Sequence, residues 1–331
     1  NSGNFKRNAR GRESSIMKQV KIAEAVKATG GILRCGNEEA QIEQVILDSR
    51  LQTEHGLFVP IIGERNDGHC YIAGAVENGA TAVFLASSFA GAKEVLEFCK
   101  EKQVAVIEVE NTVDALQQFE SWYRDRFALP VIGITGSVGK TTTKEMVSAA
   151  LSTKKRVLKT IGNRNSQLGL PLMMFELDDS YDIAVIEMGM SQFGEMARLS
   201  DIAKPECAVM TNIGTSHIAQ LKTRENIRKE KLCIVHHFVT GSSLFLNGND
   251  RLLQETATQI TQKSLTIDCN KDTYAALEKA MAVTYGIAEG QGGDFDFSAK
   301  CIRTTEHGTQ FIAVYQENGS LKELPVELKV Y

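Results

Sequence analysis

A glycine-rich string near the middle of the chain has the residue types that hold phosphate groups. It follows the apolar, β-branched run Val131–Thr135 and consists of Gly136, Ser137, Val138, Gly139, Lys140, Thr141 and Thr142. The glycines let the backbone turn so that several N–H groups face one point, and a helix that begins there adds positive potential. We expect Lys140 to reach the β- and γ-phosphates of a nucleotide and the Thr141 hydroxyl to ligate Mg²⁺. The string is not the strict phosphate-loop motif, because Ile134 stands at its first glycine position, and an ordinary turn with a surface lysine is the alternative.

Polar side chains also follow two other strand-like runs. Glu187 comes directly after Ile183–Ile186, and His217 lies in the loop beyond Cys207–Thr211. The carboxyl ends of parallel strands meet at one edge of a sheet, so we expect both side chains near the glycine-rich string. A carboxylate at that edge can hold Mg²⁺ beside the phosphates. The alternatives are a solvated glutamate at a strand end and a histidine that makes only structural hydrogen bonds.

The pattern of residues before Pro130 predicts a first α/β domain over residues 17–128. Strand-like runs alternate with helical patterns there, which is typical of a sheet covered by helices. The expected strands are Gln44–Leu47, Leu57–Ile62, Ala82–Leu85 and Val104–Val109. The expected helices are Met17–Thr29, Ala73–Asn78, Lys93–Lys100 and Asn111–Phe127.

Residues 129–331 predict a second α/β domain that carries the glycine-rich string. Short apolar runs separated by helical patterns indicate a doubly wound, mainly parallel sheet. These runs are Val131–Thr135, Ile183–Ile186, Cys207–Thr211 and Ser243–Leu246. The last stretch, Ala282–Tyr331, has alternating apolar residues and predicts hairpins or edge strands.

Length and composition exclude several classes of protein. The chain has 331 residues, of which 43% are hydrophobic, enough for about two domains with real cores. The formal charge of −4 argues against a protein built chiefly to bind nucleic acid, and no apolar run approaches the ~20 residues that cross a bilayer.

Seven scattered cysteines without a C-x-x-C pair indicate reduced thiols in a cytoplasm. Residues 1–16 are basic without an apolar core, and we expect a disordered leader or a cloning remnant.

Several strings resemble the Mur ligase family of ATP-dependent amide ligases. T-G-S-V-G-K-T-T-T-K-E (Thr135–Glu145) is similar to the family's ATP loop, and Glu187 and T-N-I-G-x-x-H (Thr211–His217) are similar to the segments that accompany it. Further similar strings are G-N-R-N-S-Q-L-G-L-P (Gly162–Pro171), E-M-G-M-x-x-x-G-E (Glu187–Glu195), D-S-R (Asp48–Arg50), G-L-F-V (Gly56–Val59) and G-E-R-N-D-G-H (Gly63–His69). Within the family these strings resemble most the ligases that add D-alanyl-D-alanine to a UDP-MurNAc-tripeptide. The resemblance spans Met17 to Tyr331.

The resemblance implies a reaction, its cofactors and its partners. ATP phosphorylates the terminal carboxylate of UDP-MurNAc-tripeptide, and the amine of D-Ala-D-Ala then attacks the acyl phosphate and expels inorganic phosphate. ATP and Mg²⁺ are the implied cofactors, and the implied protein is a cytoplasmic monomer of peptidoglycan precursor synthesis, with no nucleic-acid or membrane partner. Whether the third peptide residue is meso-diaminopimelate or lysine stays open.

The resemblance also assigns roles to residues. Lys140, His217 and Lys231 would be catalytic, and Thr141, Glu187, His217 and Lys231 would lie at the Mg²⁺ sites. Asn247 and Asp250 would contact the nucleotide together with residues 136–142. Ser49 and Arg50 would meet the UDP part of the substrate, and Asn163, Asn165 and Ser166 its acyl end.

The position of Lys231 matches a lysine that members of the family carbamylate. That modification turns a cation into an anionic oxygen ligand for a hard metal. Lys229 is a rival, because Cys233 stands where the family usually has an acid. Without the resemblance, the charge-dense run Arg224–Lys231 is typical of a solvated helix face.

The chain departs from the family pattern in two further ways. Val138 replaces a frequent asparagine, which we expect to be tolerated because backbone N–H groups cradle the phosphates. The family continues into a third, Rossmann-like C-terminal domain, which we expect to be absent from this chain. The alternatives are another ligase, similar to MurE or to folylpolyglutamate synthetase, or a P-loop nucleotide-binding module without ligase activity.

Overall fold

The computed structural model describes residues 17–63, 65–288 and 295–329, which form two compact units. The first unit holds the described residues up to Leu129 together with Thr160–Asp182, and the second holds Pro130–Lys159 and the described residues from Ile183 onward. The expectation for residues 1–16 lies outside the described residues. In the described ranges we find no helix whose length and apolar character would let it span a membrane.

The first unit is built on a five-stranded sheet in the order β2-β7-β6-β5-β4. Strands β4 to β7 run parallel, β2 runs antiparallel to β7, and β1 and β3 form a separate antiparallel pair. The strands are β1 (Val20–Lys21), β2 (Ile32–Cys35), β3 (Gln41–Ile42), β4 (Gln44–Ile46), β5 (Gly56–Phe58), β6 (Ala80–Ala86) and β7 (Ala105–Val109). The helices are α1 (Ile22–Thr29), the 3₁₀ turn Gly68–Tyr71, α2 (Ile72–Glu77), α3 (Ala92–Glu101), α4 (Thr112–Arg124) and α6 (Gly169–Met174).

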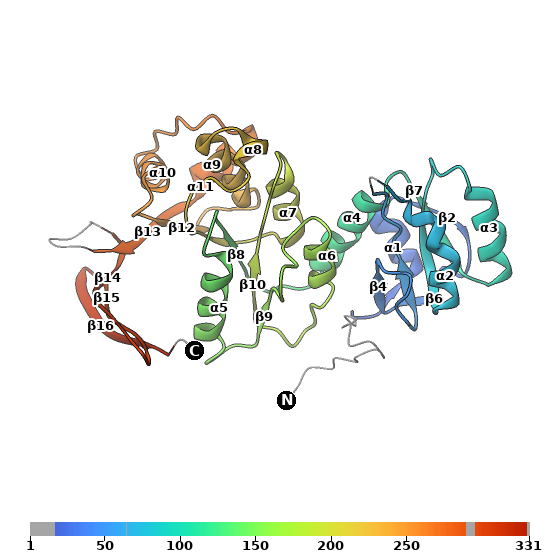
Figure 1. Ribbon diagram of the computed structural model, residues 1–331, viewed down its shortest axis with the longest axis horizontal. Helices are drawn as coiled ribbons and strands as arrows, with labels where there is room; N and C mark the ends of the chain where they lie inside the picture. The colour runs from blue at the N-terminus through green and yellow to red at the C-terminus, as the bar shows by residue number, and fades with distance from the viewer. Residues whose placement is uncertain (1–16, 64, 289–294, 330–331) are drawn as a thin grey trace. The chain divides into compact units, whose positions relative to one another are not determined.

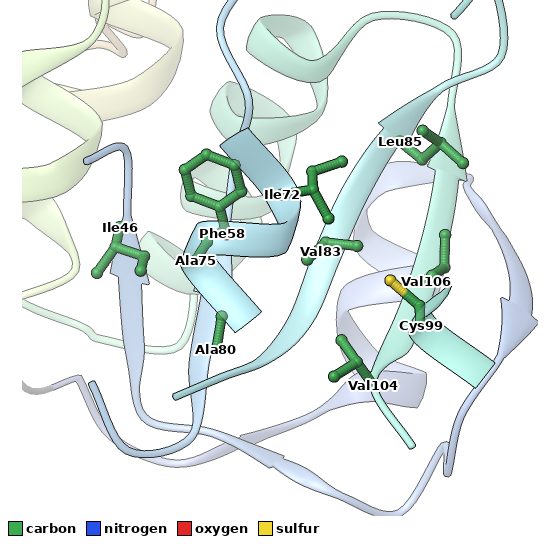
Figure 2. Close-up of a cluster of buried hydrophobic side chains, with 10 residues drawn as sticks. All are labelled: Ile46, Phe58, Ile72, Ala75, Ala80, Val83, Leu85, Cys99, Val104 and Val106. Carbon is green, nitrogen blue, oxygen red and sulfur yellow. The ribbon is translucent and has the colours of Figure 1, made fainter. Parts of the chain in front are cut away.

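A cluster of buried apolar side chains joins this sheet to α2 and α3 (Figure 2). The cluster consists of Ile46, Phe58, Ile72, Ala75, Ala80, Val83, Leu85, Cys99, Val104 and Val106. Phe58 is 1% exposed and Val83 is fully buried, so each contributes roughly 1.5–3 kcal/mol through removal of apolar surface from water. The strands read as apolar runs because both faces of a parallel sheet are covered.

All expected elements of the first unit are found with ends shifted by one or more residues, and two of them differ most from the structure. The helix expected over Met17–Thr29 begins at Ile22, because Val20 and Lys21 pair with β3 instead. The strand expected over Leu57–Ile62 ends at Phe58, two residues before Pro60, which has no N–H to donate to a ladder.

Residues Thr160–Asp182 pack with the first unit, whereas the sequence-based division placed them in the second. The ring of Phe175 lies 5.2 Å from that of Phe119 and 5.3 Å from that of Tyr123, both on α4. The Tyr123 hydroxyl also donates to the Leu177 carbonyl at 2.8 Å. Aromatic packing against α4 therefore determines where this segment belongs.

The second unit is built on a nine-stranded sheet in the order β16-β15-β14-β13-β12-β11-β8-β10-β9. Strands β9 to β13 and β8 run parallel, which confirms the expected α/β class with a mainly parallel sheet. The strands are β8 (Val131–Thr135), β9 (Val157–Lys159), β10 (Ile183–Glu187), β11 (Cys207–Met210), β12 (Ser243–Asn247), β13 (Met281–Ile287), β14 (Phe297–Thr305), β15 (Gly308–Glu317) and β16 (Ser320–Leu328). The helices are α5 (Lys140–Leu151), α7 (Glu195–Ala203), α8 (Ile218–Leu221), α9 (Arg224–Leu232), the 3₁₀ turn Cys233–Val235, α10 (Arg251–Thr261) and α11 (Lys271–Lys279).

The last part of the chain only partly follows the expectation of hairpins. Strand β13 pairs in parallel with β12 and so belongs to the doubly wound sheet, which corrects that expectation. Strands β14, β15 and β16 form the antiparallel ladder that the alternating pattern predicts. Figure 1 shows them as a curved ribbon of strands, drawn in red.

Candidate functional site

The glycine-rich string forms the turn between β8 and α5. Gly136 (φ 152°) and Gly139 (φ 83°) adopt backbone conformations that residues with a Cβ rarely adopt. A Cβ at Gly136 would lie 1.9 Å from the Thr211 hydroxyl oxygen, so only glycine fits there. Helix α5 begins at this turn. The N–H groups of its first residues have no carbonyl acceptor within the helix.

Two lysines converge on the turn. The Lys140 ammonium donates to the Gly136 carbonyl at 3.0 Å, and the Lys231 ammonium donates to the same oxygen at 3.1 Å. Lys231 is 2% exposed, and its burial together with the nearby Lys140 charge lowers its pKa from 10.5 to about 7. Lys229 instead pairs with Asp268 at 2.5 Å. Of the two lysines considered from sequence, the structure brings Lys231 to the turn.

A hydroxyl and a carboxylate meet beside the turn. The Thr141 hydroxyl donates to Glu187 Oε2 at 2.8 Å, and Glu187 is only 3% exposed at the end of β10. Both are hard oxygen donors of the kind that Mg²⁺ prefers, so these residues fit a magnesium ion. The described residues hold no group of three or more histidine, cysteine, aspartate or glutamate side chains that could bind a metal by itself. A metal here would therefore also need ligands such as hydroxyl, water or phosphate oxygens.

His217 lies at the start of α8 and is exposed. Its backbone is left-handed, with φ 63°, which is uncommon for a residue other than glycine. It follows β11, the strand next to β8 in the sheet.

Asn247 and Asp250 support the segment after β11. The Asn247 side chain donates to the Thr211 carbonyl at 2.8 Å. Asp250 accepts from the Ile213 N–H at 2.9 Å, and it also caps α10 by accepting from Leu252 and Leu253. Sequence reasoning assigned both residues to the nucleotide, and the structure shows them in contact with the protein's own backbone.

Glu230 is a buried carboxylate that sequence reasoning did not single out. Its two oxygens accept from the N–H groups of Gly194 (3.0 Å) and Met196 (2.9 Å), at the start of α7. This negative charge at a helix N-terminus ties α9 to α7, and so helps to fix Lys231, the next residue. The string of charged residues around it resembled a solvated helix face, which hid this role.

A cavity of about 600 Å³ in the first unit holds the residues expected to meet UDP. It lies where β4 and β5 end, as parallel sheets predict, and Ser49 and Arg50 line it. The Arg50 guanidinium donates to both oxygens of Asp48, at 2.8 and 2.9 Å. The cavity is further lined by Leu47, Phe58, Ile61, Asn66, Gly68 and Tyr71.

The asparagine-rich segment belongs to the first unit by its packing. Asn165 donates its N–H to the Asn163 carbonyl at 2.8 Å, and the Ser166 hydroxyl accepts from the Gly169 N–H at 3.3 Å. These bonds form a tight turn that leads into α6.

The second unit thus has the architecture of a P-loop nucleotide-binding domain: a parallel sheet, a glycine-rich turn after β8, and a helix that begins with Lys140-Thr141. The model of the Mur ligase middle domain matches residues 134–329. The chain belongs to the Mur ligase family, which confirms the resemblance of its motifs.

Three relatives show how far the similarity extends. The chain is 38% identical over 304 residues to the UDP-N-acetylmuramoyl-tripeptide–D-alanyl-D-alanine ligase of Bacillus subtilis (strain 168), and the match covers 92% of this chain and 59% of that protein. It is 27% identical to a MurF crystal structure from Acinetobacter baumannii, with a TM-score of 0.75 over 94% of this chain and 62% of that one. MurF from Thermotoga maritima in complex with ADP is 28% identical, with a TM-score of 0.66 over 85% of this chain and 57% of that one. The chain therefore spans about three fifths of the length of these relatives.

Proposed function

We propose that this chain is the substrate- and ATP-binding part of a ligase that joins D-alanyl-D-alanine to UDP-MurNAc-tripeptide through an acyl phosphate. The observation that carries the proposal is the convergence of Lys140 and Lys231 on one loop carbonyl, beside the Thr141–Glu187 pair. The relatives that carry this enzyme name, one of them bound to ADP, support it.

The glycine-rich turn and Lys140 would bind the phosphates of ATP. A carboxylate is a poor acyl donor, so its oxygen must first become part of a phosphate leaving group. Transfer of the γ-phosphoryl group depends mainly on positioning and on neutralisation of negative charge. Backbone N–H groups at the start of α5 and the Lys140 ammonium supply positive potential where that charge develops.

Thr141, Glu187, His217 and a carbamylated Lys231 would hold Mg²⁺. When bound, the ion would draw phosphate and carboxylate oxygens together despite their like charges. A Lys231 amine with a pKa of about 7 is neutral in roughly half of the molecules near pH 7, and only a neutral amine can attack CO₂. The nitrogen lone pair forms the bond to carbon, and the displaced proton leaves to solvent, so the carbamate becomes an anionic oxygen donor.

The first unit would bind the UDP-linked substrate. Arg50 is 66% exposed in its side chain and lines the cavity, so it can donate to a diphosphate while its position is fixed by Asp48. Ser49 lies beside it. Asn163, Asn165 and Ser166 would face the peptide's acyl end.

Phosphate release from ATP by the native protein tests the proposal. Release that requires both UDP-MurNAc-tripeptide and D-Ala-D-Ala is the expected result. Equal release in the absence of either substrate would identify a P-loop nucleotide hydrolase without ligase activity and overturn the proposal. Comparison of tripeptides with meso-diaminopimelate and with lysine then identifies the third residue.

A further inference from the structure

The residues between the two loop glycines have all of their backbone hydrogen-bonding groups paired. The Ser137 N–H donates to the Asn212 carbonyl and to Asn212 Oδ1, each at 3.1 Å, and the Val138 N–H donates to the same Oδ1 at 3.0 Å. The Ser137 carbonyl accepts from the Ser216 hydroxyl at 3.2 Å. The Val138 carbonyl accepts from the Thr211 hydroxyl at 2.5 Å and from Asn212 Nδ2 at 3.3 Å. Every one of these partners lies in the segment Thr211–Ser216.

Asn212 is the centre of this set of contacts. Its carboxamide accepts two N–H groups and donates to one carbonyl, so one side chain holds both residues of the turn. Ser137 is 8% exposed, and an unpaired backbone group costs about 1–3 kcal/mol when it is shielded from water. Removal of this side chain therefore frees the turn to move.

The segment that carries Asn212 is itself fixed from the other side. Asn247 donates to the carbonyl of Thr211, and Asp250 accepts from the N–H of Ile213. The guanidinium of Arg224 donates to the Ile213 carbonyl at 2.9 and 2.5 Å. The residues before and after Asn212 are therefore hydrogen-bonded to β12, to α9 and to the residue that caps α10. These bonds hold the backbone of Asn212 in place.

We infer that Asn212 is a positioning residue for nucleotide binding, an inference that rests on the proposed function. Asn212 accepts hydrogen bonds from the N–H groups of Ser137 and Val138. The next N–H groups, from Gly139 to Thr142 at the start of α5, can then donate to phosphate oxygens. By fixing the first half of the loop, Asn212 keeps the second half in its binding conformation before a nucleotide arrives. Preorganisation of this kind strengthens binding, because the loop is already ordered before the nucleotide binds and no entropy is lost in ordering it then.

The same contacts would fit a second role for Asn212, in which it hinders nucleotide binding, and an experiment distinguishes the two roles. If the Asn212 carboxamide occupied the place of a phosphate, nucleotide would have to displace it, and its removal would tighten binding. If Asn212 supports the loop, its removal weakens binding. The two roles differ in the sign of the change in Kd.

The test uses Asn212→Ala in the 331-residue chain, with amide hydrogen exchange and ADP titration in the presence of Mg²⁺. In the nucleotide-free protein, exchange at Ser137 and Val138 should accelerate at least tenfold. The Kd for ADP should rise about tenfold, because the loop of the variant must be ordered when ADP binds. Asn270→Ala is the matched control, because Asn270 also accepts a backbone N–H, that of Thr273 at 2.7 Å, in another part of the second unit. The control should change neither quantity.

A second variant separates loss of the acceptor from general damage to the fold. Asn212→Asp keeps an oxygen for the Ser137 and Val138 N–H groups, so their slow exchange should persist even though the added charge opposes ADP. Fast exchange in this variant, or an unchanged or lowered Kd in Asn212→Ala, overturns the inference. Failure of the unmodified chain to bind ADP would contradict the proposed function instead, and the exchange measurements would still decide the role of Asn212.

Discussion

At the scale of single residues, two cations share one carbonyl oxygen at the loop. Lys140 and Lys231 both donate to Gly136 O, and one of them is almost completely buried. Two like charges so close together destabilise each other, and burial of Lys231 adds a desolvation cost. Both effects lower the pKa of Lys231 to about 7, so this amine loses its proton far more readily than an exposed lysine.

The buried Lys231 predicts a pH dependence of stability. With a pKa of about 7 in the folded state and 10.5 as its ordinary value, the folded state releases this proton first as the pH rises. Below pH 7 both states are protonated and the cost of the buried charge is fully present. Between about 7 and 10.5 the unfolded state holds more protons, so the free energy of unfolding rises with pH, by at most about 1.4 kcal/mol per unit.

Lys231→Met should remove this slope. The variant is expected to be more stable than the unmodified chain near pH 7, with a difference that shrinks toward pH 10, because Gly136 O keeps Lys140 as its donor. Urea unfolding followed by circular dichroism in CO₂-depleted buffers at several pH values measures the difference. A difference that stays constant with pH would show that Lys231 does not titrate in this range.

Gly136→Ala should damage the loop. The new Cβ would meet the Thr211 hydroxyl at 1.9 Å, and φ is 152°. We expect a loss of about 1–3 kcal/mol of stability and of most ADP affinity, from overpacking and backbone strain. Gly74→Ala is the control, because an added Cβ there would have no atom within 4 Å apart from its chain neighbours and its own helix backbone, and helix α2 should gain roughly 0.5–1 kcal/mol. Equal ADP binding by the Gly136 variant would contradict the account of the turn.

At the scale of elements, α4 joins separate segments of the first unit. Tyr123 on this helix is fully buried, and its hydroxyl accepts from the Lys18 N–H at 2.9 Å and donates to the Leu177 carbonyl at 2.8 Å. Its burial raises the pKa of the phenol to about 12, so the hydroxyl keeps its proton at any physiological pH. One side chain thus connects the start of the described chain to the segment after α6.

Tyr123→Phe should destabilise the first unit by about 1–3 kcal/mol, because it leaves two backbone groups without their partner. The single tryptophan of the chain, Trp122, lies beside Tyr123 on α4, so its fluorescence during urea unfolding reports this unit. Tyr274→Phe, at a residue that is 38% exposed, is the control and should have little effect. A loss of the same size in both variants would mean that the two hydrogen bonds contribute nothing specific.

The elements show what the sequence could predict and what it could not. The strand Val131–Thr135 and the helix from Lys140 were expected with these bounds, because apolar runs and a glycine-rich turn are local signals. The two-residue strands β1 and β3 were missed, since they depend on pairing over a distance in sequence. The same limit applies to the site: Lys140, Thr141 and Glu187 follow from motif and strand ends, whereas the supporting roles of Asn212 and Glu230 depend on contacts that no local pattern specifies.

At the scale of the whole molecule, the proposed function places ligands of different chemistry in two regions of the chain. The first unit has a cavity at the ends of β4 and β5, and the second has a glycine-rich turn at the end of β8. Both regions lie at the carboxyl ends of parallel strands, the position where such sheets bind ligands. Each unit has its own sheet and core, so each region should keep its ligand when the other is disabled.

Two substitutions test this independence in opposite directions. Arg50→Ala should weaken binding of UDP-MurNAc-tripeptide about tenfold, because a charged donor to the diphosphate is lost, while the Kd for ADP stays unchanged. Lys140→Ala should weaken ADP binding at least tenfold and leave the UDP-linked ligand unaffected. Isothermal titration of the 331-residue chain with each ligand measures all four affinities, and Lys155→Ala, an exposed lysine after α5, is the control for charge removal. If Arg50→Ala changes ADP affinity as strongly as it changes affinity for the UDP-linked ligand, the two regions cannot be separate binding sites, and the division of labour between the units is wrong.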